Sequence, residues 1–184
     1  MPNWCSNDLV VTGDTDSLRE WSEQCLDQEV EDMTNEFTWE NLLPVPEELR
    51  EKEGFGSVAF ARSIGEKPET TAEQERLLDL YGATSWWDWC VTHWGTKWGP
   101  VDSTCYGKDD SSYSVSFDTA WSPPEGAILK MSELFPDLIF VLAFEETGMD
   151  FQGIMGVVKG KTVFEKSTEC LPSMDYVLDE CRDG

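Results

Sequence analysis

Apolar and polar positions along the chain predict a mixture of strands and helices. Residues 9–12 form a short apolar run that ends at Gly13, which indicates a buried strand. Ser17 and Glu20 have the spacing of a capping box, so a helix is expected to begin there. The buried stripe of this helix would contain Leu18, Trp21 and Cys25, with Leu26 and Val30 beside it. Residues 37–42 alternate between apolar and polar side chains and predict a second strand.

The second half of the chain has a more regular pattern. Residues 112–119 alternate and predict a strand. Its buried face would consist of Tyr113, Val115 and Phe117. Ser122 is expected to cap a helix that Pro136 stops, and the nearly continuous apolar run of residues 138–144 is typical of a central strand covered on both faces. The remaining elements would be a hairpin of residues 151–158 and 161–166, and a short helix at residues 173–181.

Between these halves the pattern weakens, and residues 45–107 are expected to leave the core as a helical and loop insertion. A short helix at residues 47–53 and a firmer one from Thr71 to Gly82 are predicted within it. The order of elements then predicts an α+β fold of the ferredoxin-like split βαβ type. This fold has an antiparallel sheet with helices on one face, and the insertion would lie between the second and third strands. Residues 1–184 are expected to form a single domain.

Tryptophans are concentrated in residues 85–101, which hold five of the nine in the chain. Each indole removes about 150 to 250 Å² from water when it is buried, so this segment is expected to lie under the rest of the fold. The spacing of Trp87, Val91, Trp94 and Trp98 predicts one face of a helix that ends near Gly95. The tryptophans predicted to lie in the core are Trp87, Trp94, Trp98 and Trp121.

Acidic side chains dominate the charge of the chain. Of 184 residues, 13 are basic and 37 are acidic, which gives a net charge of −24 and a pI near 4.1. This charge repels a phosphate backbone, so it excludes ordinary DNA or RNA binding and favours a basic protein as partner. The six cysteines form no CxxC pair, and neither a basic leader nor a long apolar run is present. We therefore expect reduced thiols in a soluble, cytoplasmic protein with no membrane contact.

Four sequence blocks carry a resemblance to a known family. They are residues 1–7 (MPNWCSN), 94–98 (WGTKW), 117–124 (FDTAWSPP) and the segment from Phe144-Glu145-Glu146 to Phe151-Gln152-Gly153. In this order they span most of the chain, which resembles the Api92-like (Api-ninety-two-like) family of small phage and plasmid proteins. The resemblance implies a ferredoxin-like domain and a mobile-element origin, hence a bacterial host cell. It implies no activity and supplies no catalytic residues.

Acids gather between Asp14 and Glu53, where 14 acidic and three basic side chains give a net charge of −11. Carboxylates one helical turn apart lie about 5.4 Å apart along the axis, which is near the spacing of successive phosphates. A helix edged in this way can occupy a DNA-binding groove, and the alternative is a solvated face that only keeps the protein dispersed. The residues predicted to contact a partner are Glu20, Glu23, Asp27, Glu29, Glu31, Asp32 and Glu36.

Three smaller sets of side chains have residue types found in reactive or binding sites. In one set, two possible metal ligands have helical spacing and a thiol could be the third ligand: Cys90, His93 and Cys105. Another has the paired carboxylates used in hydrolysis: Glu145, Glu146, Asp150 and Asp118. The third combines a cation with indoles, as a pocket for a nucleobase or a partner's side chain would: Lys97, Trp94, Trp98 and Trp121.

A lone histidine and the lack of a nucleophile–base pair favour structural interpretations of these sets, so no catalytic residue, metal or cofactor is predicted. The predicted function is a non-catalytic acidic phage or plasmid protein. It would bind a host nucleic-acid-handling defence system, of the restriction or CRISPR type, as a DNA mimic. The alternative is a nucleotide or small-molecule binding module, extending to a weak hydrolase, built on the tryptophan-rich segment and Asp118. A structural or dosage-related accessory protein is the third class.

Overall fold

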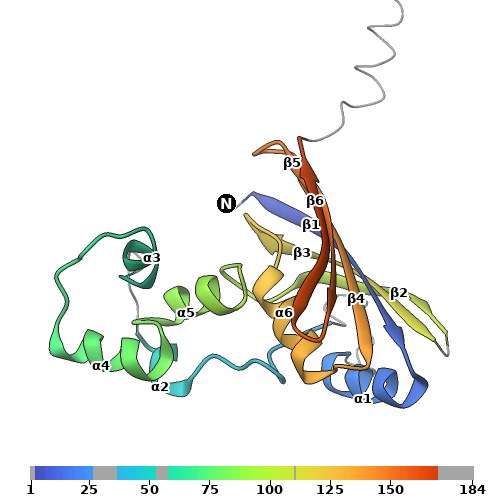
Figure 1. The fold of residues 1–184 in the computed structure, drawn as a ribbon, viewed down its shortest axis with the longest axis horizontal. Helices are drawn as coiled ribbons and strands as arrows, with labels where there is room; N and C mark the ends of the chain where they lie inside the picture. The colour runs from blue at the N-terminus through green and yellow to red at the C-terminus, as the bar shows by residue number, and fades with distance from the viewer. Residues whose placement is uncertain (1–2, 27–36, 53–57, 110, 170–184) are drawn as a thin grey trace, which may run out of the picture.

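The computed structural model describes residues 3–26, 37–52, 58–109 and 111–169, and within these ranges six strands form one antiparallel sheet (Figure 1). The strands are β1 Trp4–Gly13, β2 Val101–Lys108, β3 Ser112–Ala120, β4 Leu138–Glu146, β5 Phe151–Val158 and β6 Lys161–Thr168. Their order across the sheet is β2-β3-β1-β4-β5-β6. Among the described residues, no helix is both long and apolar enough to cross a membrane.

The first four strands have the ferredoxin-like arrangement that the sequence predicts. Helix α1, Thr15–Cys25, follows β1, and helix α6, Glu125–Leu134, connects β3 to β4. β3 pairs antiparallel with β1 and lies between β1 and β2, which is the split βαβ topology. The hairpin β5–β6, which turns at Lys159 and Gly160, extends the sheet beyond β4, as predicted.

Within the described residues, helices cover only one face of the sheet. Along β4, Leu138 and Phe140 are fully buried, whereas Ile139 between them is 44% exposed. The prediction that residues 138–144 are covered on both faces is therefore wrong. Branched apolar side chains favour a strand whether or not their face is covered, so an apolar run alone could not show that the second layer was missing.

The helical insertion lies between the first and second strands rather than between the second and third. It contains α2 Glu47–Arg50, α3 Val58–Ser63, α4 Ala72–Tyr81 and α5 Trp86–His93. The predicted strand at residues 37–42 is absent, because Phe37 makes only an isolated bridge to Leu26 and the chain then turns, with two amides donating to the carbonyl of Trp39. The second strand is β2, so residues 101–107 belong to the sheet and not to the insertion.

Two predicted helix starts shift to neighbouring residues. Asp14 caps α1, because its Oδ1 accepts from the amide of Ser17 at 3.0 Å, so Ser17 is inside the helix and not its cap. Ser122 does not cap α6; its hydroxyl instead donates to the carbonyl of Gly95 at 2.6 Å. Helix α4 agrees with its prediction, with a capping box at Thr71 and a left-handed Gly82 at its end. The helix predicted at residues 173–181 lies outside the described residues.

One continuous core joins the insertion to the sheet. Trp39 is completely buried, and its ring centroid lies 5.9 Å from that of Trp94 at the end of α5 and 5.9 Å from that of Phe117 on β3. Gly126 at the start of α6 allows the end of α5 to approach, and the amide of Ala127 donates to the carbonyl of Trp94 at 3.2 Å. We call this contact between α5, Trp39, β3 and α6 the indole junction.

Replacing Gly126 tests how tight the indole junction is. A Cβ there would lie 2.4 Å from the carbonyl oxygen of His93 and 3.2 Å from the carbonyl carbon of Trp94, both of them backbone atoms. Although alanine is favoured over glycine in a helix by about 1 kcal/mol, we expect Gly126→Ala to lower the free energy of unfolding by about 1–3 kcal/mol.

Gly156→Ala is the matched control, since its added Cβ would be 3.6 Å from the nearest side-chain atom. Urea unfolding should place this variant within about 0.5 kcal/mol of the parent protein. A Gly126→Ala protein that is as stable as the parent would show that the two helix ends are not packed this closely.

Candidate functional site

The tryptophans of α5 do not form the buried face that the sequence predicts. Helix α5 ends at His93, so the predicted stripe cannot continue to Trp98. Trp89 and Trp94 are the buried indoles of this segment. Trp87 is half-buried. Trp98 and Trp121 are 36% and 41% exposed, so these two do not belong to the core, contrary to the prediction.

Local hydrogen bonds explain which face of α5 is buried. The hydroxyl of Ser85 accepts from the amide of Asp88 at 3.2 Å and caps the helix. The carboxylate of Asp88 accepts from the amide and the hydroxyl of Thr84, at 3.0 and 3.3 Å. With these bonds Asp88 can be fully buried, and the helix is rotated so that Trp89 and Cys90 face the core.

Lys97 lies near the rings of Trp86, Trp98 and Trp121, and Trp4 lies beside Trp98; we call this group the indole cluster. Trp98 lies 6.4 Å from Trp4 and 6.4 Å from Trp121, measured between ring centroids. The Nζ of Lys97 is 4.3 Å from the centroid of Trp98 and 5.4 Å from that of Trp121, which are cation–π distances. Trp121 has a left-handed backbone, φ 67°, and its amide donates to the carbonyl of Asn3 at 3.0 Å. The start of β1 and the end of β3, which lie opposite each other in the sheet, are thus tied to this cluster.

A cavity of about 500 Å³ lies beside the indole cluster, and we call it the indole cavity. It is formed by the turn before α2, by α2 and α5, and by the loop that leads into β2. Its lining residues are Glu40, Val45, Arg50, Trp86, Cys90, Trp94, Lys97, Trp98, Gly99, Pro100 and Val101. It therefore combines aromatic walls with two cations and one carboxylate.

The three candidate metal ligands, Cys90, His93 and Cys105, do not form a cluster. Cys90 is buried, whereas His93 is exposed and stacks on Trp89 at 4.5 Å between ring centroids, with its Nδ1 3.0 Å from the Trp89 carbonyl. Within the described ranges no cluster of three or more histidine, cysteine or acidic side chains is arranged to hold a metal ion. The geometry fits a structural role for these side chains.

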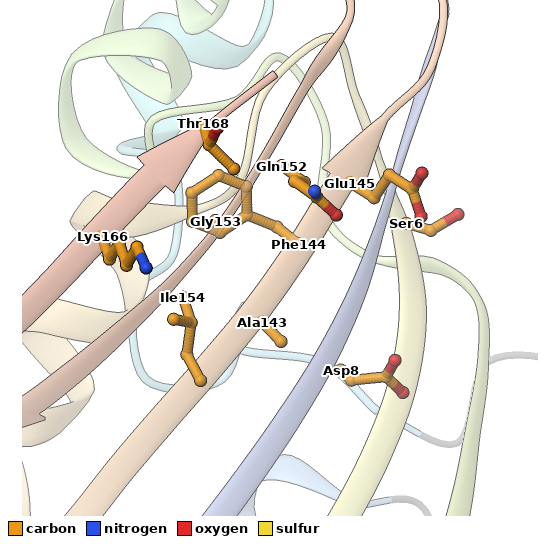
Figure 2. A pocket seen from close by; sticks show the side chains of 10 residues that line it. All are labelled: Ser6, Asp8, Ala143, Phe144, Glu145, Gln152, Gly153, Ile154, Lys166 and Thr168. Atoms are coloured by element: carbon orange, nitrogen blue, oxygen red, sulfur yellow. The ribbon is translucent and has the colours of Figure 1, made fainter. Parts of the chain in front are cut away.

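The predicted carboxylate set is divided between the two faces of the sheet. Glu146 is buried on the helix-covered side and accepts from the amides of Gly148 and Met149, at 2.8 and 2.6 Å, which stabilises a turn. Glu145 instead lines a shallow depression of about 350 Å³ on the open face. Figure 2 shows Ser6 and Asp8 from β1 and Lys166 from β6 around the same depression. Hydrolysis by this set of carboxylates is therefore not supported.

The acids predicted to contact a partner are only partly within the described residues. Glu20 and Glu23 are exposed on α1. Asp27, Glu29, Glu31, Asp32 and Glu36 lie outside the described residues. Helix α1 ends at Cys25, and Leu26 is extended, so the predicted acidic row does not continue along one helix. The sequence predicted a longer helix because apolar residues keep a helical spacing as far as Val30.

Among the described residues of the insertion, four acids contact basic side chains: Glu47, Glu48, Glu73 and Glu75. Arg76 contacts both Glu48 and Glu73, and Lys52 contacts Glu73 at 2.7 Å. Arg76, and then Lys52, lower the pKa of Glu73 to about 2. Arg62 contacts Glu75 at 2.5 Å and lowers the pKa of that carboxyl. The insertion is therefore less negative toward a partner than its sequence suggests.

The fold and its open sheet define this chain as a ferredoxin-like α+β protein. The chain belongs to the Api92-like family, because the family model described as the ferredoxin-like domain in Api92-like protein matches residues 91–182, half of its length. The crystal structure of protein api92 from Yersinia pseudotuberculosis is similar, with a TM-score of 0.57 and 12% identity. That similarity covers 94% of this chain and 100% of the other and concerns the fold alone. No curated protein matches the chain.

Cys90, which lines the indole cavity, and two other buried cysteines can be tested by alkylation. Burial raises the pKa of Cys5, Cys25 and Cys90 to about 12. We expect iodoacetamide at neutral pH to leave these three thiols unmodified in the native protein and to modify them after unfolding, as peptide mass spectrometry would show.

The same shift predicts the pH dependence of stability. A raised pKa means that the folded protein holds the thiol protons more tightly than the unfolded chain does. The stabilisation from protonated thiols is complete below pH 9 and is lost as the pH rises toward 12.

In the alkylation experiment, modification of native Cys90 as fast as in the unfolded chain would contradict its burial.

Proposed function

We propose that this chain is a non-catalytic protein of a phage or plasmid that acts in the bacterial cytoplasm. It binds a host protein that handles nucleic acid for defence, of the restriction or CRISPR type, and occupies that protein's DNA-binding surface as a mimic. The observation that supports this proposal best is the uneven distribution of basic residues among its acids. Residues 14–36 contain nine acidic residues and one basic residue, whereas four acids of the insertion, Glu47, Glu48, Glu73 and Glu75, contact basic side chains.

The α1 flank, as we call residues 14–36, has nine acidic side chains and one basic side chain, Arg19. Arg19 contacts Asp16 at 3.2 Å and Glu23 at 4.0 Å, and all three side chains are more than 60% exposed. Exposed pairs of this kind are worth about 0–1 kcal/mol, so they are easily exchanged for a partner's cation. A basic partner can therefore engage these carboxylates at small cost.

Magnitudes show why a local concentration of charge is required. The molecule exposes 11167 Å². Divided by its 24 net negative charges, this leaves about 465 Å² for each charge. Duplex DNA has roughly one charge for each 110 Å² of its cylinder. Evenly spread acids would not imitate DNA, so the proposal depends on the α1 flank.

The hydrolase form of the alternative function lacks geometric support. Asp118 pairs in register with Ser6 on β1 and with Val101 on β2, and it is not among the residues that line the indole cavity. A carboxylate outside the cavity is not placed to activate water for a ligand inside it. We therefore propose no catalytic role for Asp118.

Competition with DNA tests the proposed function. Purified restriction and CRISPR nucleases from a bacterial host would be loaded with labelled DNA, and release of the DNA by this protein would be followed by fluorescence anisotropy. We expect release from at least one nuclease at about 50 mM salt and much weaker release at about 200 mM. The triple variant Asp16→Asn, Glu20→Gln, Glu23→Gln should weaken this effect roughly tenfold, as three exposed ionic contacts would.

A matched control removes three exposed acids from the insertion: Glu66→Gln, Glu69→Gln and Asp79→Asn. It changes the net charge by the same amount but leaves the α1 flank intact. Equal losses in the two triple variants would assign the effect to overall charge, and release that is insensitive to salt would reject mimicry altogether.

A further inference from the structure

The indole cavity has the size and walls of a small-molecule site, which goes beyond the proposed function. Its volume of about 500 Å³ lies within the range of about 300–1,000 Å³ that is typical of ligand pockets. Trp94 is buried at its base, while Trp86 and Trp98 form walls that remain partly accessible. Val45, Pro100 and Val101 complete the apolar lining. A flat aromatic ring suits such walls, because indole faces stack on other π systems.

Two cations lie on this cavity in a strongly acidic chain. The Nζ of Lys97 lies 6.0 Å from the ring centroid of Trp86 and 4.3 Å from that of Trp98. Within the described part of the chain, Lys97 forms no ion pair with a carboxylate, although acids outnumber bases 37 to 13. The ammonium group is therefore available to an anionic group on a ligand.

Arg50 is held at the cavity by its own contacts. Its Nε donates to the carbonyl of Val45 at 3.3 Å, and its guanidinium contacts the exposed carboxylate of Glu47 at 3.3 Å. The remaining donors of the planar guanidinium suit a phosphate or carboxylate group. Lys97 and Arg50 together give this cavity a charge opposite to that of the whole molecule.

Glu40 supplies an acceptor on the same cavity. A Cβ on Gly99 would lie 2.9 Å from the Glu40 Oε1, so a glycine at this position lets the carboxylate lie against the loop. Two further polar groups of the lining are less accessible to a ligand: the Trp94 Nε1 donates to the carbonyl of Leu43 at 3.1 Å, and the Cys90 thiol is buried. The charged groups that a ligand meets are therefore one acceptor and two cations.

We propose that the indole cavity binds a small planar aromatic anion of the nucleoside monophosphate class. The base stacks on the indoles of Trp86 and Trp98, an N–H of the base donates to Glu40, and the phosphate contacts Lys97 and Arg50. Long nucleic acids are repelled by the net charge of −24, whereas a single nucleotide brings only about two negative charges. The site thus selects mononucleotides over polymers.

Calorimetric titration of the full chain with AMP, GMP, CMP and UMP tests this proposal. We expect saturable binding of at least one nucleotide at concentrations up to about 10 mM, with weaker binding of the matching nucleoside and of inorganic phosphate. Lys97→Gln should weaken binding about tenfold or more, because it removes the charge that meets the phosphate. Trp98→Leu should also weaken it, because leucine has no ring on which a base can stack.

Lys130→Gln is the matched control, because Lys130 is an exposed lysine on α6 that pairs with Glu133 and does not line the cavity. It should bind nucleotide as the parent protein does. Circular dichroism of each variant separates a loss of binding from a loss of folding, and the wild-type comparison of nucleotide with nucleoside needs no variant. No saturable binding of any of the four nucleotides, or equal binding by Lys97→Gln, would overturn the proposal.

Discussion

Burial of Trp39 between Trp94 and Phe117 is the contact on which the arrangement of this molecule depends. A ferredoxin-like sheet covers one face with its own two helices, and here the same layer also has to hold a long insertion. The indole junction solves this by placing the ring of Trp39 within 6 Å of the rings of Trp94 and Phe117, where burial removes a large aromatic area from water. Because the close approach at Gly126 involves backbone atoms, the insertion is fixed and not merely tethered.

The junction also separates the two surfaces to which we assign functions. Figure 1 shows α1 at one end of the molecule and α3 and α4 at the other, with α5 leading from these helices toward the sheet. The α1 flank contains α1, whereas the indole cavity lies between the insertion and the sheet. Carboxylates next to the cavity would pair with its two cations and neutralise them, so the separation allows one chain to carry both surfaces.

The sequence predicted the elements whose pattern arises from local contacts, and it failed where distant contacts decide. The strand around Val115 alternates because one face is covered, the strand around Phe140 is an apolar run, and Gly82 ends α4 because it adopts a left-handed backbone. Residues 37–42 alternate equally well, yet Phe37 and Trp39 are buried by tertiary packing without a strand. β2 was missed because its side chains are polar and its register is irregular. Of the candidate site, the cation and indoles around Lys97 were visible in sequence, but Arg50 and Glu40 reach the cavity only through the fold.

Native-state hydrogen exchange is the measurement that tests most directly whether the insertion and the sheet share one core. If the indole junction holds them together, amides of α5 should exchange only through the same global opening as amides of β1, β3 and β4, with the same free energy. Exchange of α5 amides at a free energy several kcal/mol below that of the sheet would contradict the account, because the insertion would then open while the ferredoxin-like domain stayed folded.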